Sequence, residues 1–196
     1  MKILAIQASP RIGGNTDILT DKALEGAKAK GAEIEKIVLS ILKFSPCLEC
    51  EKINHDGTCL VSDDFQMIFE KIRDADVIIF ASPIFFGSVS AQAKILIDRF
   101  QCTWIGKHIF KNDYFKKIKN GAFIAVEASN RKDFLDNAKS IVKNLFAVIK
   151  VKYTQEILAT GITEKADILK HQEILKGAFE LGQNLVLSPT KEVKNG

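Results

Sequence analysis

The residues best suited to bind a ligand lie in a short polar loop near the start of the chain, Ser9-Pro10-Arg11-Ile12-Gly13-Gly14-Asn15-Thr16, called the phosphate loop below. A helical pattern begins just after it, near Asp17. The first N–H groups of a helix have no partner inside the helix and carry partial positive charge, so they attract anions. We therefore predict that the loop binds a phosphate monoester. The alternative is an ordinary capped turn between a strand and a helix.

Each residue type in the phosphate loop has a defined use toward a phosphate. Glycine lets the backbone approach an oxyanion closely, hydroxyl and amide groups donate hydrogen bonds, and arginine adds a fork of charged donors. The loop has neither the P-loop pattern nor the dinucleotide-binding glycine pattern, which favours a mononucleotide whose terminal phosphate needs no metal. The expected contacts are Ser9, Arg11, Gly14, Asn15 and Thr16.

An apolar stretch, Pro83–Ser88, is the second candidate for ligand contact. It places Ile84, Phe85 and Phe86 after a buried strand, at a sheet edge that should be polar. These side chains either cover the core or form a wall against a flat apolar ring, whose polar atoms would meet backbone N–H groups. A phosphate site at one loop and an aromatic wall two strands away match the two ends of FMN.

Four cysteines are the third group of reactive side chains. Cys47 and Cys50 form a C-x2-C pair and Cys59 follows closely, so one iron–sulfur cluster or metal could bind all three. Zinc lacks a fourth ligand at a suitable spacing, and a Cys47–Cys50 redox pair lacks a thioredoxin-like context. Cys102 lies far along the chain in a helical stretch, where we expect a buried, small apolar side chain.

These candidates must be positioned by the elements that the apolar patterns predict. We expect strands at 3–8, 32–39, 76–81, 121–126 and 151–159, and helices at 17–30, 62–74, 91–100, 132–149 and 165–187. Strands that alternate with helices indicate an α/β fold, a doubly wound five-stranded parallel sheet with helices on both faces, in the flavodoxin-like order. The loops after the first, third and fourth strands then meet at one edge, where such sheets bind ligands.

Composition excludes several classes of protein. A length of 196 residues, with 46% hydrophobic and 27% charged residues, predicts a single domain over 1–196 with a frayed tail from about residue 188. The net charge of +4 is too small to indicate nucleic-acid binding, and no window approaches the ~18 apolar residues of a membrane span. The N-terminus resembles no signal peptide, so we expect a cytoplasmic protein whose cysteines do not form structural disulfides.

The phosphate loop, the stretch Ala81–Gln92 and the sequence Asp98-Arg99-Phe100 together resemble the NADPH-dependent FMN reductase family, and within it the iron–sulfur flavoprotein branch. The resemblance extends over nearly the whole chain, about residues 1–187. It implies a flavodoxin-like fold, bound FMN, and reduction by NAD(P)H or by a protein donor. It also implies a homodimer or homotetramer with the flavin near a subunit interface.

The same resemblance assigns residues to the two ends of FMN. It implies that Ser9, Arg11, Asn15 and Thr16 face the phosphate. The residues that it places against the isoalloxazine ring are Pro83, Ile84, Phe85, Phe86 and Gly87. Ser129 is a further expected contact, although its loop, Glu127–Arg131, lacks the glycines expected there.

The cysteine spacing departs from that of the iron–sulfur flavoproteins. They carry four cysteines here, spaced C-x2-C-x2-C-x5-C or nearly so, whereas this chain has Ile53 at the third position. The remaining three thiolates could hold a [4Fe–4S] cluster with one open iron, or His55 or Asp56 could complete a site. The aliphatic Ile53 instead favours a loop that has lost its cluster, so a [4Fe–4S] cluster is not expected.

Three hypotheses for function follow. The first is an FMN-containing oxidoreductase that passes electrons from NAD(P)H or a reduced protein to a quinone, a flavin or another small acceptor. The flavin carries that chemistry, so no catalytic side chain is named. The second is an iron–sulfur flavoprotein electron carrier without NAD(P)H activity, with ferredoxin as a candidate partner. The third is a mononucleotide-binding module without redox function.

Overall fold

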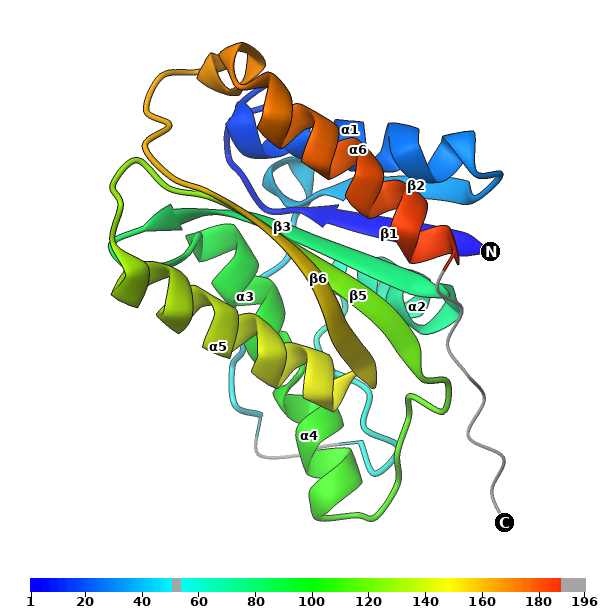
Figure 1. Ribbon diagram of the computed structural model, residues 1–196. Helices are drawn as coiled ribbons and strands as arrows, with labels where there is room; N and C mark the ends of the chain where they lie inside the picture. Colours follow the sequence, from blue (N-terminus) through cyan, green and yellow to red (C-terminus); the bar gives the residue numbers. More distant parts are fainter. Residues whose placement is uncertain (51–53, 188–196) are drawn as a thin grey trace.

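A parallel sheet covered by helices on both faces forms the framework of the molecule (Figure 1). The computed structural model describes residues 1–50 and 54–187. The five parallel strands have the order β2-β1-β3-β5-β6, and a short β4 pairs antiparallel with β3. The strands are β1 (Lys2–Gln7), β2 (Glu33–Val38), β3 (Val77–Phe85), β4 (Ser88–Val89), β5 (Lys119–Val126) and β6 (Val151–Ala159). This topology confirms the predicted flavodoxin-like α/β fold.

The helices connect the strands and cover the sheet in two layers. Figure 1 shows α1 and α6 on one face and α3 and α5 on the other. The α-helices are α1 (Asn15–Ala29), α2 (Phe65–Asp74), α3 (Ala91–Arg99), α4 (Gln101–His108), α5 (Lys132–Val148) and α6 (Gln172–Leu187). Two short 3-10 helices, η1 (Leu39–Ile41) and η2 (Asp167–Lys170), complete the set. None of the helices in this part of the chain is long and apolar enough to cross a membrane.

Alternation along the central strands divides the core between the two faces. In β1, Ile3 and Ala5 belong to the cluster that also contains the apolar residues of α1 and α6. Leu4 and Ile6 belong to the cluster formed with α2, α3 and α5. Because β1, β3 and β5 are buried on both faces, their carboxyl ends are held at fixed positions along one edge of the sheet.

Two glycines allow α1 and α6 to pack with their backbones in contact. A Cβ atom at Gly26 would lie 1.9 Å from the carbonyl oxygen of Phe179, and one at Gly182 would lie 1.8 Å from that of Ala23. No side chain fits at such distances, so these positions require glycine. This contact fixes the last helix beside the helix that follows the phosphate loop.

The predicted loop 82–90 is instead largely a β-hairpin. β3 continues through Pro83 to Phe85, and Ile84 pairs with Val89 of β4. The turn residues Phe86 and Gly87 have φ values of +50° and +74°, the positive values that a tight two-residue hairpin requires. The apolar sequence of β3 is continuous, so it gave no sign of the point at which β3 stops pairing with β5 and starts pairing with β4.

The prediction of one helix over 165–187 is wrong at its start. Ala166 has a left-handed conformation with φ +62°, η2 follows it, and α6 begins only at Gln172. The Asn15 side chain binds backbone groups on both sides of Ala166, so a contact distant in sequence sets this break. The predicted frayed tail from about residue 188 and the role of Ile53 lie outside the described residues.

Candidate functional site

A pocket of about 220 Å³ lies at the carboxyl ends of the central strands. It brings together residues from the phosphate loop, the end of β3, the end of β5 and the segment after β6. The lining residues are Ser9, Arg11, Gly14, Asn15, Thr16, Pro83, Ile84, Phe85, Val126, Ala128, Ile162, Thr163 and Lys165. All five residues predicted for the phosphate, and three of those predicted for the ring, therefore meet in one pocket.

Local hydrogen bonds give the phosphate loop its shape. The Ser9 hydroxyl oxygen accepts from the Arg11 N–H at 3.1 Å, and the Arg11 carbonyl accepts from the Gly14 N–H at 3.0 Å. Gly13 has φ +68°, and a Cβ at Gly14 would lie 2.9 Å from the Arg11 carbonyl oxygen. Both glycines are thus required by the backbone path, which turns tightly before α1 begins.

Asp17 lies in the first turn of α1, directly after the phosphate loop, and its charge is balanced by other groups. One carboxylate oxygen accepts from the Gly13 N–H at 2.8 Å, and the other accepts from the Lys36 amine at 3.0 Å. Burial alone would lower the pKa of Lys36, but the carboxylates of Asp21 and Asp17 hold it above the usual value. Asp17 therefore stabilises the backbone of the phosphate loop and does not line the pocket.

The start of α1 offers backbone donors to the pocket. Gly14 is the N-cap, and no side chain caps this helix. The first bond along the helix runs from the Ile18 N–H to the Gly14 carbonyl at 3.0 Å. The N–H groups of Asn15, Thr16 and Asp17 therefore have no partner within the helix, which is the arrangement that binds phosphate at helix N-termini.

The charged side chains that line the pocket are both cationic. Arg11 comes from the phosphate loop and Lys165 from the segment after β6. Within residues 1–50 and 54–187, neither side chain forms an ion pair, although most other lysines near the sheet edges do. The Lys165 stem passes close to the loop, since its Cε would lie 3.9 Å from a Cβ at Gly13. Two unneutralised cations beside a helix N-terminus favour an anionic ligand.

The structure gives Asn15 a second role besides lining the pocket. Its amide nitrogen donates to the Glu164 carbonyl at 2.7 Å, and its oxygen accepts from the Ile168 N–H at 3.1 Å. Asn15 thereby holds the segment that carries Lys165 over the phosphate loop. One amide hydrogen remains for a ligand, so the predicted contact with a phosphate remains a prediction.

The apolar wall is tied to the phosphate loop by two buried serines. The Ser90 hydroxyl donates to the Ala8 carbonyl at 2.6 Å, directly before the loop. The Ser90 N–H in turn donates to the Ser82 hydroxyl at 2.9 Å, next to Pro83. These bonds fix the distance between the wall formed by Pro83, Ile84 and Phe85 and the donors at the start of α1.

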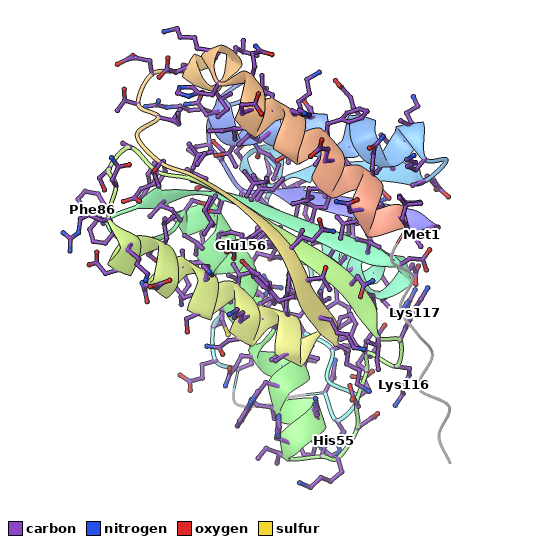
Figure 2. All side chains as sticks on the ribbon, viewed as in Figure 1. Met1, His55, Phe86, Lys116, Lys117 and Glu156 are labelled. Atoms are coloured by element: carbon purple, nitrogen blue, oxygen red, sulfur yellow. The ribbon has the colours of Figure 1, made fainter. Side chains whose placement is uncertain are left out.

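Three residues predicted to contact the flavin do not line the pocket. Phe86 is fully exposed, and Figure 2 shows it at the far tip of the molecule. Gly87 lies at the turn, where its carbonyl accepts from the Asn137 side chain at 2.7 Å. The Ser129 hydroxyl instead donates to the buried carboxylate of Glu127. The hairpin turn therefore leaves Phe86 and Gly87 outside the pocket lining.

The sequence prediction missed five lining residues, Val126, Ala128, Ile162, Thr163 and Lys165. Val126 and Ala128 end the fourth parallel strand, so the rule that ligands bind at the carboxyl edge could have identified them. The other three follow the last strand, in a segment held by the Asn15 side chain and by the bond from the Ile162 N–H to the Glu127 carbonyl at 3.2 Å. No local pattern signals that contact, and Lys165 was assigned to a helix.

All four cysteines line a second, smaller cavity of about 70 Å³. It lies between the described parts of the cysteine segment, residues 47–50 and 58–61, and the junction of α3 and α4, and Arg99 also lines it. Cys102 is half-buried, and its thiol donates to the Arg99 carbonyl at 3.1 Å. Burial, and after it the nearby Cys59 sulfur, raises the pKa of the Cys102 thiol to about 12. The sequence predicted a buried, small apolar side chain at Cys102, whereas the structure shows a half-buried thiol that forms a hydrogen bond.

The described residues do not form a ready-made metal site. No group of three or more His, Cys, Asp or Glu side chains within 1–50 and 54–187 is arranged to hold a metal ion. The predicted ligands Cys47, Cys50 and Cys59 line one cavity without converging on a common point. These residues, as arranged here, do not fit a [4Fe–4S] cluster.

Arg99 anchors the segment that carries the cysteines. Its guanidinium is 1% exposed and binds the Asp63 carboxylate at 2.7 and 3.1 Å, the Ser45 carbonyl at 2.9 Å and the Val61 carbonyl at 3.0 Å. Burial would raise the pKa of Asp63, but Arg99 and backbone donors lower it below the usual value. Buried ion pairs of this kind are costly to break.

Comparison with known proteins places the pocket in a family context. A family model of the NADPH-dependent FMN reductases matches residues 1–154. An iron–sulfur flavoprotein of Methanocaldococcus jannaschii is 39% identical over 129 residues, which are 66% of this chain and 63% of that protein. An iron–sulfur flavoprotein of Methanosarcina thermophila is 40% identical over 99 residues, 50% of this chain and 52% of that protein. These matches thus span about half to two thirds of the relatives' own length.

A solved structure of a flavone reductase has the same fold, with a TM-score of 0.72 and 26% identity over 95% of this chain and 62% of that chain. The family match includes the phosphate loop and the β3–β4 hairpin, and ends before Ile162 and Lys165. Fold and sequence therefore agree, and the chain belongs to the NADPH-dependent FMN reductase family of flavin-dependent oxidoreductases.

Proposed function

We propose that this chain binds FMN in the pocket between the phosphate loop and the β3–β4 hairpin. We further propose that it uses NAD(P)H to reduce a quinone, a free flavin or another small acceptor. One observation supports this best. At one end, a single pocket has a helix N-terminus and two cations that form no ion pair with any described residue, and at the other it has the wall of Pro83, Ile84 and Phe85. FMN has matching ends, a phosphate and a flat ring.

The chain's own residues bind and orient the cofactor in this proposal. Backbone N–H groups at the start of α1, together with Arg11 and Lys165, hold the phosphate, and the serine-anchored hairpin positions the ring wall. The lining contains no Asp, Glu, His or Cys, so within this pocket the described side chains supply binding and electrostatics. FMN, when bound, supplies the electron-transfer chemistry.

The pocket is smaller than most complete ligand sites. Its volume of about 220 Å³ is below the ~300–1,000 Å³ typical of pockets that enclose a drug-sized molecule. Phe85, which lines it, is 44% exposed, and the next residue, Phe86, is fully exposed. We infer that a second subunit covers the ring end, in a homodimer or homotetramer. Size-exclusion chromatography with light scattering, with and without FMN, tests that assembly.

Spectroscopy and turnover together test the proposed function. The purified protein should be yellow and bind about one FMN per chain. Under anaerobic conditions it should oxidise NADH or NADPH when a quinone or free FMN is added as acceptor. Failure of the protein to bind FMN would refute the proposal. Binding without oxidation of either nucleotide would refute its catalytic part.

An electron carrier reduced by another protein is the second candidate. It is supported by the relatives named iron–sulfur flavoproteins. The two functions differ in their electron donor. Reduction of the bound flavin by ferredoxin, and not by NADH or NADPH, would favour the carrier.

A further inference from the structure

The second cavity contains chemistry that the proposed FMN site does not use. Its two best-positioned thiols are Cys59 and Cys102, which come from segments far apart in the sequence. Both sulfurs lie near the same residue: Cys102 donates to the Arg99 carbonyl at 3.1 Å, and Cys59 is among the groups that hold the pKa of Arg99 above its usual value. Both side chains are half-buried, so neither is fully enclosed by the protein.

The backbones that carry these two thiols are in direct contact. A Cβ at Gly57 would lie 3.5 Å from the Cα of Thr103 and 3.7 Å from the Cys102 carbonyl oxygen. A Cβ at Gly106 would lie 2.5 Å from the Cα of Gly57. The Thr103 hydroxyl also donates to the Gly57 carbonyl at 3.2 Å. A disulfide needs Cα atoms about 4.4–6.8 Å apart, so it can form only between segments that are in contact, as these two are.

The buried side chain of Arg99 stabilises the contact between the cysteine segment and α4. Its guanidinium binds the carbonyls of Ser45 and Val61 and the carboxylate of Asp63, on both sides of the cysteine segment. The same residue precedes α4, where Cys102 lies. The segment carrying Cys59 and the helix carrying Cys102 are therefore fixed to one buried side chain, which limits how far the two sulfurs can separate.

We propose that Cys59 and Cys102 form a reversible dithiol–disulfide pair that reacts with small-molecule disulfides. Cys59 attacks, because the Cys102 thiol is engaged with the Arg99 carbonyl. The S–S bond of the small disulfide breaks, a mixed disulfide forms on Cys59, and one small thiol leaves and takes up a proton. Cys102 then attacks the Cys59 sulfur, the proton of its thiol passes to the departing sulfur, and the second small thiol is released. The two cysteines are oxidised by two electrons, and one disulfide is reduced to two thiols.

The C-x2-C pair is the competing arrangement within the same cavity. Cys47 and Cys50 line it, but among the described contacts neither thiol binds Arg99 or α4. A link between these two would leave the contact between the cysteine segment and α4 unchanged. A Cys59–Cys102 link would join the two segments covalently, so the two products are distinguished by which peptides become joined.

Oxidised glutathione is the probe for the experiment. The reduced, full-length protein is incubated anaerobically with it, free thiols are alkylated, and proteolytic peptides are analysed without reduction. We expect a peptide joining Cys59 to Cys102 in the wild-type protein and in the double variant Cys47→Ser/Cys50→Ser. The variant Cys102→Ser should stop at a glutathione adduct on Cys59. The variant Cys59→Ser should give neither product at Cys102.

Three results would overturn the proposal. One is a Cys47–Cys50 peptide as the main product. Another is complete alkylation of Cys59 and Cys102 after incubation. The third is about four iron and four sulfide ions per chain in anaerobically purified protein, lost in Cys59→Ser, because a cluster would then occupy the thiol. The wild-type peptide map needs no variant to fold, and it is independent of FMN binding.

Discussion

Removing the amine of Lys165 should weaken the binding of FMN and leave the binding of riboflavin unchanged. Riboflavin has the same ring and ribityl chain as FMN but lacks the phosphate. Lys165 lies at the cationic end of the pocket, and among the described residues it has no ion-pair partner. Lys165→Met keeps most of the apolar stem and removes only the charge, so the ratio of the two affinities isolates the phosphate contact.

The exposure of Lys165 limits the expected size of the effect. Two unit charges 4 Å apart interact by about 1 kcal/mol in water and about 4 kcal/mol near a protein surface. Lys165 is exposed, which favours the lower figure, while a phosphate monoester carries about −1.5 to −2 charges. An estimate of about 1–2 kcal/mol corresponds to a roughly 5–30-fold increase in the Kd of FMN.

Fluorescence titration of the apoprotein with each ligand measures this ratio. Lys170→Met is the matched control, because Lys170 lies in the same segment but pairs with Asp167 at 2.8 Å and does not line the pocket. The difference between wild type and Lys165→Met should shrink as salt is added, since salt screens exposed charges. An equal loss of affinity for FMN and riboflavin, or no loss for either, would refute the reasoning.

Three further predictions concern the framework. Gly182→Ala should destabilise the protein by about 1–3 kcal/mol in urea unfolding, since its Cβ would overlap α1, whereas Gly177→Ala, which has ordinary contacts, should not. Burial lowers the pKa of Lys119 to about 8, so the unfolded chain binds that proton more tightly and stability should rise between pH 8 and 10.5. Lys119→Met should abolish this rise. Because it removes the buried charge, it should also raise the free energy of unfolding at pH 7 by roughly 2–3 kcal/mol, measured by urea unfolding. Arg99→Met should lower the free energy of unfolding by about 3–5 kcal/mol in the same assay, because it leaves Asp63 without its buried partner. The control Lys94→Met, which removes an exposed pair with Asp98, should lower it by under about 1 kcal/mol.

The sequence was sufficient for the sheet and for most of the phosphate end. Buried parallel strands are continuous apolar runs, so β1, β3 and β5 were recognisable by composition alone. The phosphate loop was recognisable because its function needs local features, two glycines and a helix start within a few residues. The residues predicted there all line the pocket, although their contact with a phosphate remains to be measured.

The ring end was harder to predict because its geometry depends on pairing between strands. Phe85 and Phe86 are neighbours with the same side chain, yet one lines the pocket and the other is at the exposed tip. Side chains alternate along a strand, and the turn at Gly87 decides which residue faces the pocket. Apolarity alone could not separate them, since both residues continue the same apolar run.

Contacts between distant segments explain the remaining differences at both cavities. Asn15 and Ile168 are 153 positions apart, and their hydrogen bond brings Lys165 to the phosphate loop. In the same way Arg99 brings Cys102 to a cysteine segment that, judged by spacing, had only three thiols. When ligands are counted from the spacing of residues in the sequence, only residues close together in the chain are considered. In this fold the groups that change the chemistry, a second cation in one cavity and a fourth thiol in the other, arrive from elsewhere.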